Sequence, residues 1–312
     1  MKPLIHVDRM RGVALITAIL VVALATTAAV AMVARQQFDV RRSANMLAME
    51  QGLLYQQGIE GWTMQILRRD RKDNQTDSAA DDWATQLPPL PVEGGQIAGR
   101  VDDLQGLFNV NSLLLNGKAD ALTLERFKRL MLVVGVEQFN ADALVDWLDA
   151  DIEPTLPNGA EDGVYLGRQP PCLSANRLMG SRSELRLLAG MSMDDYQRLA
   201  PYVTVLPTAS AINVNTAPKE VLRSLAEGLS DSDAESLISG RGEKGYKSVE
   251  EFLRQDVLAG RGVKPDGLSV SSNYFMVTSR LRIGSVENGY SAMIYRNQNG
   301  GTALVRRAQG EL

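Results

Sequence analysis

The residues with the clearest potential for chemistry are acidic and lie near the middle of the chain. Asp149 and Asp151 belong to the run Asp-Trp-Leu-Asp-Ala-Asp-Ile-Glu at 146–153, and Glu161 and Asp162 follow after a loop that contains Pro and Gly. If the loop folds back, these carboxylates meet. Ca²⁺ takes roughly six to eight hard oxygen ligands and tolerates irregular loops, and carboxylates at a helix C-terminus oppose the helix dipole unless a cation compensates. The spacing is not that of an EF-hand, so a solvated acidic loop stays the alternative.

Other reactive side chains are scarce. The chain of 312 residues has one Cys, Cys172, and one His, His6. A single thiol forms no intrachain disulfide, and without a partner base we interpret it as a packed or loop residue. Ser-His catalysis, Cys-His catalysis and a His-ligated zinc site all need a His in the body of the chain. The inventory therefore predicts that the protein is not an enzyme, and the net charge of −4 does not favour nucleic acid.

The elements that must position these residues begin with an apolar N-terminal helix. A basic leader (Lys2, Arg9, Arg11) precedes the segment 13–34, whose 22 residues include no charge, Gly or Pro. At about 1.5 Å per residue this helix is about 33 Å long, enough to cross a membrane. A cleaved secretory signal ending at 23–25 would be shorter than this run, since its apolar region has roughly 7 to 15 residues. A plain membrane anchor explains the length but not the Gly at the junction.

The junction itself supports a third interpretation. The sequence Gly12-Val13-Ala-Leu-Ile-Thr17 resembles the type III signal that prepilin peptidase cuts in type IV pilins and type II secretion pseudopilins. The resemblance implies cleavage after Gly12 and N-methylation of Val13. It also implies a Glu at the fifth mature position, which pairs with the terminal amine of the subunit ahead and neutralises two charges in an apolar environment. Thr17 stands there instead, which suits a subunit with no subunit ahead of it, at the tip.

A helix and a sheet are expected around a large interruption. The spacing of apolar and small residues extends the helix from about Val13 to Leu67, and three glycines in it (Gly52, Gly58, Gly61) suggest close packing of neighbours. Strand patterns occur at 96–104, 270–283, 290–295 and 302–306, whereas Pro88–Pro91 predicts a stiff extended piece. These segments predict a four-stranded antiparallel sheet that is interrupted after its first strand.

The interrupting segment is helical and repetitive. Phe-Asn-Val-Asn at 108–111 and Ile-Asn-Val-Asn at 212–215 are near-identical, and we expect Ser112 and Thr216 after them to cap helices. Helices are predicted at 121–134, 141–149, 183–188, 194–200, 218–227, 230–239 and 248–253.

The second repeat resembles the helix-hairpin-helix modules that bind DNA phosphates. Its hairpin at 227–233 is acidic and lacks the second Gly of such modules. Between 209 and 262 there are seven basic and nine acidic residues, a net charge of −2. A phosphate-binding surface needs the opposite balance, so we interpret this as a packing module without the ligand.

Over its whole length the chain resembles the minor pseudopilin K family of type II secretion systems. The resemblance implies an α+β fold, with a pilin-like long N-terminal helix and a four-stranded antiparallel sheet interrupted by a large all-α insertion of helix-hairpin-helix or SAM-like repeats. The expected parts are a leader peptide (1–12), a transmembrane half-helix (13–34), a pilin-like helix and first strand (35–104), the insertion (105–268) and the remaining strands (269–312). The family's insertion binds calcium, which implies a structural Ca²⁺ here, with Asp149, Asp151, Glu161 and Asp162 as candidate ligands.

The same resemblance implies a function, a cellular location and binding partners. The protein would be a minor pseudopilin at the tip of the pseudopilus, initiating or capping its assembly for export of folded proteins across the outer membrane. Its expected partners are minor pseudopilins I, J and H, major pseudopilin G, prepilin peptidase and the inner-membrane assembly platform, with no nucleic acid. It would cross the inner membrane once, with a cytoplasmic N-terminus and a periplasmic bulk. The alternative is a membrane-anchored DNA-uptake protein with helix-hairpin-helix modules.

Overall fold

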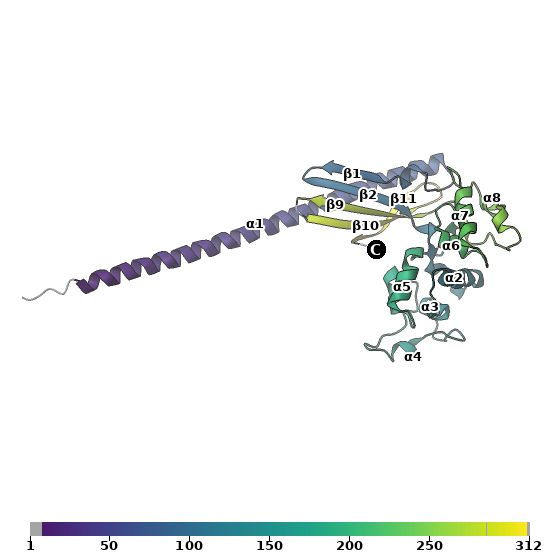
Figure 1. Ribbon diagram of the computed structural model, residues 1–312, viewed down its shortest axis with the longest axis horizontal. Coiled ribbons are helices and arrows are strands. Elements are labelled where there is room, and N and C mark those ends of the chain that lie inside the picture. Colours follow the sequence, from purple (N-terminus) through teal and green to yellow (C-terminus); the bar gives the residue numbers. More distant parts are fainter. Residues whose placement is uncertain (1–7, 285, 311–312) are drawn as a thin grey trace, which may run out of the picture.

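One long helix carries the rest of the protein at its C-terminal end (Figure 1). The computed structural model describes residues 8–284 and 286–310, so the first seven residues of the expected leader lie outside the described residues. Helix α1 runs without interruption over Asp8–Asp73, six residues beyond the end predicted from its apolar pattern. Its first half extends away from the body, and its second half lies on the sheet.

The sheet has five strands, not the predicted four. Its order is β1-β2-β9-β10-β11 and all pairs are antiparallel. The strands are β1 (Leu87–Val92), β2 (Gly95–Asp103), β9 (Tyr274–Ile283), β10 (Val286–Arg296) and β11 (Thr302–Gln309). The extra strand contains the proline-rich piece, which the sequence predicts to be extended but does not predict as a strand of the sheet. Its prolines are tolerated because β1 lies at the edge of the sheet and pairs irregularly with β2 alone.

Helix α1 covers one face of this sheet. Leu67 on the helix is fully buried in one cluster with Phe275 and Val277 of β9. Gly52 allows α1 and β10 to approach closely, because a Cβ at this position would lie 3.3 Å from the Tyr290 hydroxyl. The expectation of close packing is therefore met inside the chain only for Gly52, since a Cβ on Gly58 or Gly61 would meet nothing within 4 Å.

The segment between β2 and β9 is mainly helical, but it is not all-α as predicted. Its α-helices are α2 (Ala121–Val133), α3 (Ala141–Leu148), α4 (Asp162–Tyr165), α5 (Met193–Leu199), α6 (Lys219–Arg223), α7 (Asp231–Gly240) and α8 (Val249–Leu253). The predicted 183–188 helix is a 3-10 helix at Arg182–Leu187. Three two-stranded ladders, each of two-residue strands, accompany them: β3 (Phe108–Asn109) with β6 (Val203–Thr204), β4 (Leu114–Leu115) with β5 (Lys118–Ala119), and β7 (Ile212–Asn213) with β8 (Leu268–Ser269).

The repeated tetrapeptide has the same structural role twice. Each copy begins a short parallel ladder, β3 with β6 and β7 with β8. Asn111 donates to the carbonyls of Met179 and Leu206 and accepts from the Met179 N–H. Asn215 donates to the carbonyl of Tyr246 and accepts from its N–H. These buried amides satisfy backbone groups of distant loops, so the insertion consists of two similarly built halves.

The expected capping by the residues after the tetrapeptides is wrong. The Ser112 hydroxyl donates to the Ser210 carbonyl, and Thr216 donates to Asp103. The N-cap of α6 is Pro218. Both hydroxyls serve tertiary contacts, which outweigh a local cap and which sequence spacing cannot indicate.

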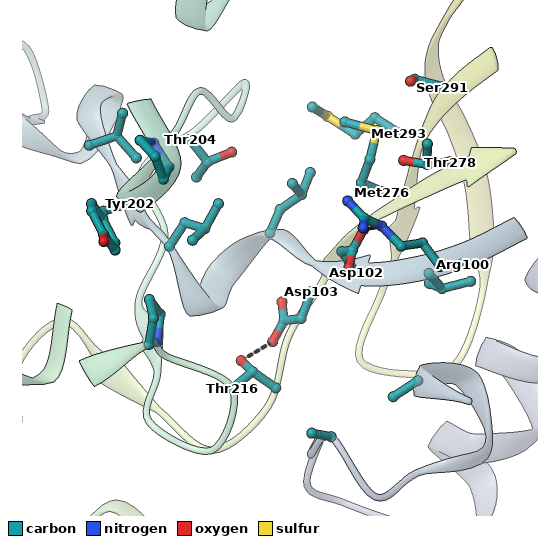
Figure 2. Close-up of a pocket in the computed structure, with 18 of the residues that line it drawn as sticks. Arg100, Asp102, Asp103, Tyr202, Thr204, Thr216, Met276, Thr278, Ser291 and Met293 are labelled. Carbon is teal, nitrogen blue, oxygen red and sulfur yellow. Dashed lines mark hydrogen bonds and ion pairs between the residues drawn. The ribbon is translucent and has the colours of Figure 1, made fainter. Parts of the chain in front are cut away.

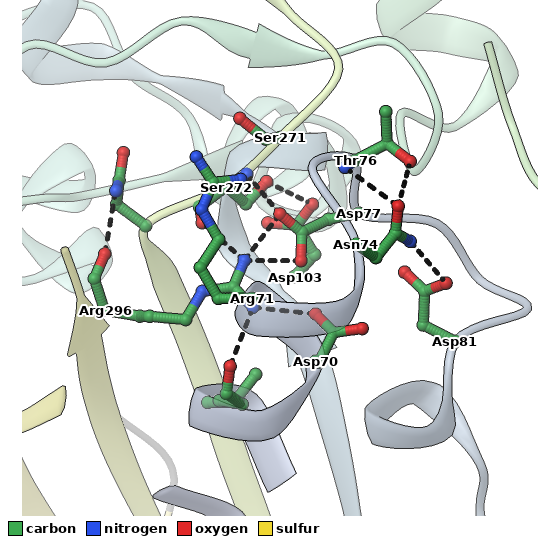
Figure 3. A network of polar contacts seen from close by, with 12 residues as sticks. Asp70, Arg71, Asn74, Thr76, Asp77, Asp81, Asp103, Ser271, Ser272 and Arg296 are labelled. Carbon is green, nitrogen blue, oxygen red and sulfur yellow. Dashed lines mark hydrogen bonds and ion pairs between the residues drawn. The ribbon is translucent and has the colours of Figure 1, made fainter. Parts of the chain in front are cut away.

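A buried ionic network joins the helix, the sheet and the insertion (Figure 3). Arg296 of β10 is 1% exposed, and its guanidinium donates to Asp77 at 2.5 and 2.6 Å, to Asp70 at 2.8 Å and to the Leu67 carbonyl. Asn213 of the insertion donates to the Asp77 carbonyl and to Asp103 of β2. The three parts of the body therefore share one polar core.

We expect Arg296→Met to lower the free energy of unfolding by about 3–5 kcal/mol, because it leaves Asp70 and Asp77 buried without their cation. Urea denaturation of the full chain in detergent micelles measures this loss. Arg69→Met is the matched control, since the Arg69–Asp73 pair at 3.7 Å is exposed and such pairs contribute less than about 1 kcal/mol. Equal losses in the two variants would contradict the assignment of the network as the junction.

Candidate functional site

The junction expected to be processed lies within α1. Gly12 and Val13 are both helical and exposed. The Thr17 hydroxyl donates to the carbonyls of Val13 (3.1 Å) and Ala14 (3.0 Å) in its own helix, so it needs no partner in an apolar environment. An 18-residue window of this helix has a mean hydropathy of 2.5 and is not buried against the rest of the protein. By length and composition the helix can cross a membrane once.

The acidic cluster is assembled at the end of α3 and the start of α4. Asp149 is the C-cap of α3, and Glu161 is the N-cap of α4. One carboxylate oxygen from each of Asp149, Asp151 and Glu161 lies within 4.8 Å of the other two. The structure thus brings together three of the four predicted residues. The fourth, Asp162, accepts from the Ser174 N–H at 2.9 Å and holds the neighbouring loop, and its role as a ligand stays a prediction.

Two further residues join the cluster. Asp146 is fully buried, and its Oδ1 accepts from the Thr155 N–H at 2.9 Å. Asn176 donates to the Asp151 carbonyl. Gly159 makes the tight loop possible, because a Cβ there would lie 2.1 Å from Asp146 Oδ2. The acidic run indicated Asp146 as a neighbour, whereas nothing in the sequence pointed to Asn176.

The cluster is rich in acceptors and poor in donors. Within the described residues, Asp146 Oδ2, Asp149 Oδ1, both Glu161 oxygens and Asn176 Oδ1 are buried without a hydrogen-bond donor. Burial raises the pKa of Glu161 to about 7, and Asp146 and Asp149 add repulsion. Burial likewise raises the pKa of Asp149 to about 6, with Asp151 and Asp146 adding to the shift. Oxygen atoms gathered in this way fit a hard cation such as Ca²⁺.

The second half of the insertion contains the hairpin that resembles a DNA-binding module. Asp231, at the start of α7, forms ion pairs with Lys219 and Arg223, and Asp233 pairs with Arg261. These ion pairs neutralise the basic side chains that would otherwise contact phosphate.

Comparisons with known proteins agree on one family. Family models described as type II secretion system protein K match residues 106–208 and 212–271. Type II secretion system protein K of Pseudomonas aeruginosa is 34% identical, and the match covers 96% of this chain and 93% of that protein. The protein of the same name from Klebsiella pneumoniae is 33% identical, and the match covers 97% of each chain. The crystal structure of the GspK-GspI-GspJ complex from enterotoxigenic Escherichia coli contains a chain matched at TM-score 0.77 and 27% identity, over 87% of this chain and all of that chain.

We expect the full chain to take up Ca²⁺ saturably in isothermal titration. Asp149→Ala combined with Asp151→Ala should weaken the affinity by about tenfold or more, because two charged ligands are removed. Glu153→Gln is the matched control, since Glu153 is exposed in the same loop and is not one of the three clustered residues. A double variant that binds as the parent does would exclude these residues as ligands.

The affinity should also fall as the pH is lowered from 7.5 to 5.5. Protons compete with the cation for Glu161 and Asp149, whose raised pKa values of about 7 and about 6 lie in this range. In EDTA, without Ca²⁺, the stability should depend on pH in the opposite direction. Because the pKa of Glu161 is raised in the folded state, its contribution to the free energy of unfolding falls as the pH rises. Thermal unfolding of the chain and of Glu161→Gln, each with EDTA and with Ca²⁺, separates the two effects.

Proposed function

Because the chain belongs to the type II secretion system protein K family, we propose that it is the minor pseudopilin at the tip of the pseudopilus. There it would initiate or cap assembly for export of folded proteins across the outer membrane. Its role is structural rather than catalytic.

Thr17 is the observation that carries the tip placement. Its hydroxyl is already bonded to Val13 and Ala14, and it offers no carboxylate to the terminal amine of a subunit ahead. The Val13 amine, once freed by cleavage, can still receive a Glu from the subunit behind. Such a subunit can have a subunit behind it but none ahead of it, so it would end the filament at the tip.

The insertion supports the same placement by its size. It lies at the end of the sheet near the C-terminal end of α1, with α2, α3, α4 and α5 displaced to one side of the helix axis (Figure 1). An insertion of about 160 residues has a radius of gyration of roughly 15 Å. A shaft that repeated this bulk at every subunit would meet clashes that one copy at the end avoids.

The N-terminal helix is the proposed anchor and the proposed contact with other subunits. Beyond the apolar span, Val40, Leu47 and Leu54 recur every seven residues and are exposed, and Gly58 and Gly61 continue this exposed side. A face of this kind fits parallel helices of other pseudopilins. The solved GspK-GspI-GspJ complex supports minor pseudopilins I and J as partners. Membership of the family leads us to propose minor pseudopilin H, the major pseudopilin G, prepilin peptidase and the assembly platform as further partners.

We also propose the orientation and the cation. The chain would cross the inner membrane once, with its N-terminus in the cytoplasm and its bulk in the periplasm. Ca²⁺ bound by Asp149, Asp151 and Glu161, with Asp162 beside them, would close the loop over Asp146. The DNA-uptake alternative is not favoured, because the hairpin cations are paired with Asp231 and Asp233.

Mass spectrometry of the membrane-extracted protein should show a chain that begins at Val13 with a methylated amine. Cleavage follows from the basic leader, Gly12 and the uninterrupted apolar helix. Gly12→Leu should retain the leader, while Thr17→Ser should be processed as the parent is. A chain that begins at Met1, near Ala25 or at Arg35 would contradict the pseudopilin assignment.

Tip placement predicts one labelled copy at one end of a pseudopilus. Deletion of the gene should reduce secretion and still permit long pseudopili when the major pseudopilin is overproduced, because the cap is absent. Immunogold labelling of purified pseudopili tests the placement. Label along the whole length would refute the tip assignment without affecting the family assignment.

A further inference from the structure

One face of the sheet is only partly covered. Side chains alternate along β9, so Phe275 and Val277 face α1, whereas Met276, Arg280 and Arg282 face the other side. The insertion covers only one end of that side, where Leu206 packs with Tyr274 and Met293. Between this contact and the hydrogen bond from Arg306 of β11 to the Gly180 carbonyl, the sheet and the insertion separate.

A groove of about 620 Å³ lies in that separation (Figure 2). Arg100, Met276 and Met293 of the sheet form one wall, and Tyr202 and Thr204 of the insertion form the other. The walls combine hydroxyl groups with flexible apolar side chains, which adapt to irregular ligand surfaces.

The groove carries more positive than negative charge. Four arginines (Arg100, Arg182, Arg241, Arg306) and two aspartates (Asp102, Asp103) line it, which gives a net charge of +2. Asp102 forms an ion pair with Arg100 at 2.8 Å, and Asp103 accepts hydrogen bonds from Ser272, Thr216 and Asn213. The surplus positive charge of the groove therefore comes from Arg182, Arg241 and Arg306.

Three of these arginines have no carboxylate partner among the described residues. Arg182 donates to the Ala200 carbonyl, Arg241 to those of Val214 and Ala217, and Arg306 to that of Gly180. The Arg306 Nε atom is buried without an acceptor. Burial lowers the pKa of Arg241 to about 10. Such cations are costly to desolvate unless an anion joins them.

The positive charge continues outside the groove. Arg280 and Arg282 are exposed on the same face of β9, in register with Ala98 and Gln96 of β2. Glu287 of β10 is exposed opposite Arg282, so these three residues together add one positive charge to the face. From Met276 to Arg282 a strand covers about 20 Å. The chain as a whole has a net charge of −4, so this concentration of arginines is local to one face.

We propose that this basic sheet face, defined by Arg100, Arg280, Arg282 and Arg306, binds an extended acidic segment of a partner protein. Guanidinium groups match carboxylates in paired geometry. Because Arg100 lies opposite Thr278 and is followed along β9 by Arg280 and Arg282, one extended acidic chain beside the groove can contact these arginines in succession. The proposal does not depend on placement at the tip, because it concerns the isolated subunit.

The test uses the full chain in nonionic detergent and a fluorescein-labelled nonapeptide of alternating Glu and Ser. Fluorescence anisotropy up to millimolar protein should show binding that weakens with added salt. The Gln/Ser peptide should bind at least about tenfold more weakly. Arg100→Gln, Arg280→Gln and Arg282→Gln combined should weaken binding of the acidic peptide about tenfold, because these side chains do not hold backbone carbonyls.

Arg254→Gln, which removes an exposed arginine of the insertion outside the groove, should leave binding unchanged. Circular dichroism checks that all variants are folded. The proposal is overturned if the acidic peptide does not bind, or if the triple variant binds it as the parent does. It is also overturned if a labelled thymidine oligonucleotide binds more tightly through the same three arginines, since that would indicate a nucleic-acid surface.

Discussion

The buried guanidinium of Arg296 is the interaction on which the arrangement of this protein depends. It reaches the Leu67 carbonyl and Asp70 at the end of α1, and Asp77 in the loop that follows. A charge that is 1% exposed is tolerated only with its carboxylates in place. A shift of α1 along β10 would leave the Arg296 charge buried without its carboxylates. These ion pairs therefore fix the position of α1 relative to the sheet.

The duplicated insertion shows how one local structure can serve two purposes. Asn109 of the first copy bonds within the insertion, to the Thr208 carbonyl and the Ser210 hydroxyl. Its counterpart Asn213 donates to the Asp77 carbonyl and to Asp103, so the second half is attached to the Arg296 network. The first half carries the carboxylate cluster. The two halves therefore differ in that the second is bonded to the Arg296 network, whereas the first carries the carboxylate cluster.

Sequence periodicity was sufficient for the elements whose residues are close along the chain. It predicted most of α1, four of the five strands of the large sheet and the helix at 230–239, which the structure has at Asp231–Gly240. Strand β1 was missed because its prolines disfavour a strand unless the strand lies at an edge, and edge position is a tertiary property.

The residues of the carboxylate cluster and of the groove also differ in whether the sequence could indicate them. Asp149, Asp151 and Glu161 were predicted because the loop between them is short enough to close. Asn176 could not be predicted, since it reaches Asp151 from a different loop. The groove was beyond prediction as well, because its arginines come from four distant segments whose meeting depends on how the insertion lies on the sheet.

The carboxylate cluster and the groove wall at Tyr202 and Thr204 belong to the same half of the insertion, and hydrogen bonds connect them. Asp162 holds the Ser174 N–H, and the chain then runs to Met179, whose carbonyl and N–H both bond to Asn111. Asn111 also donates to the Leu206 carbonyl, next to the strand that forms the groove wall. Clustered carboxylates without a cation repel one another and loosen the loop that they form. A cation at the cluster would therefore stabilise the chain segment on which the wall of the groove depends.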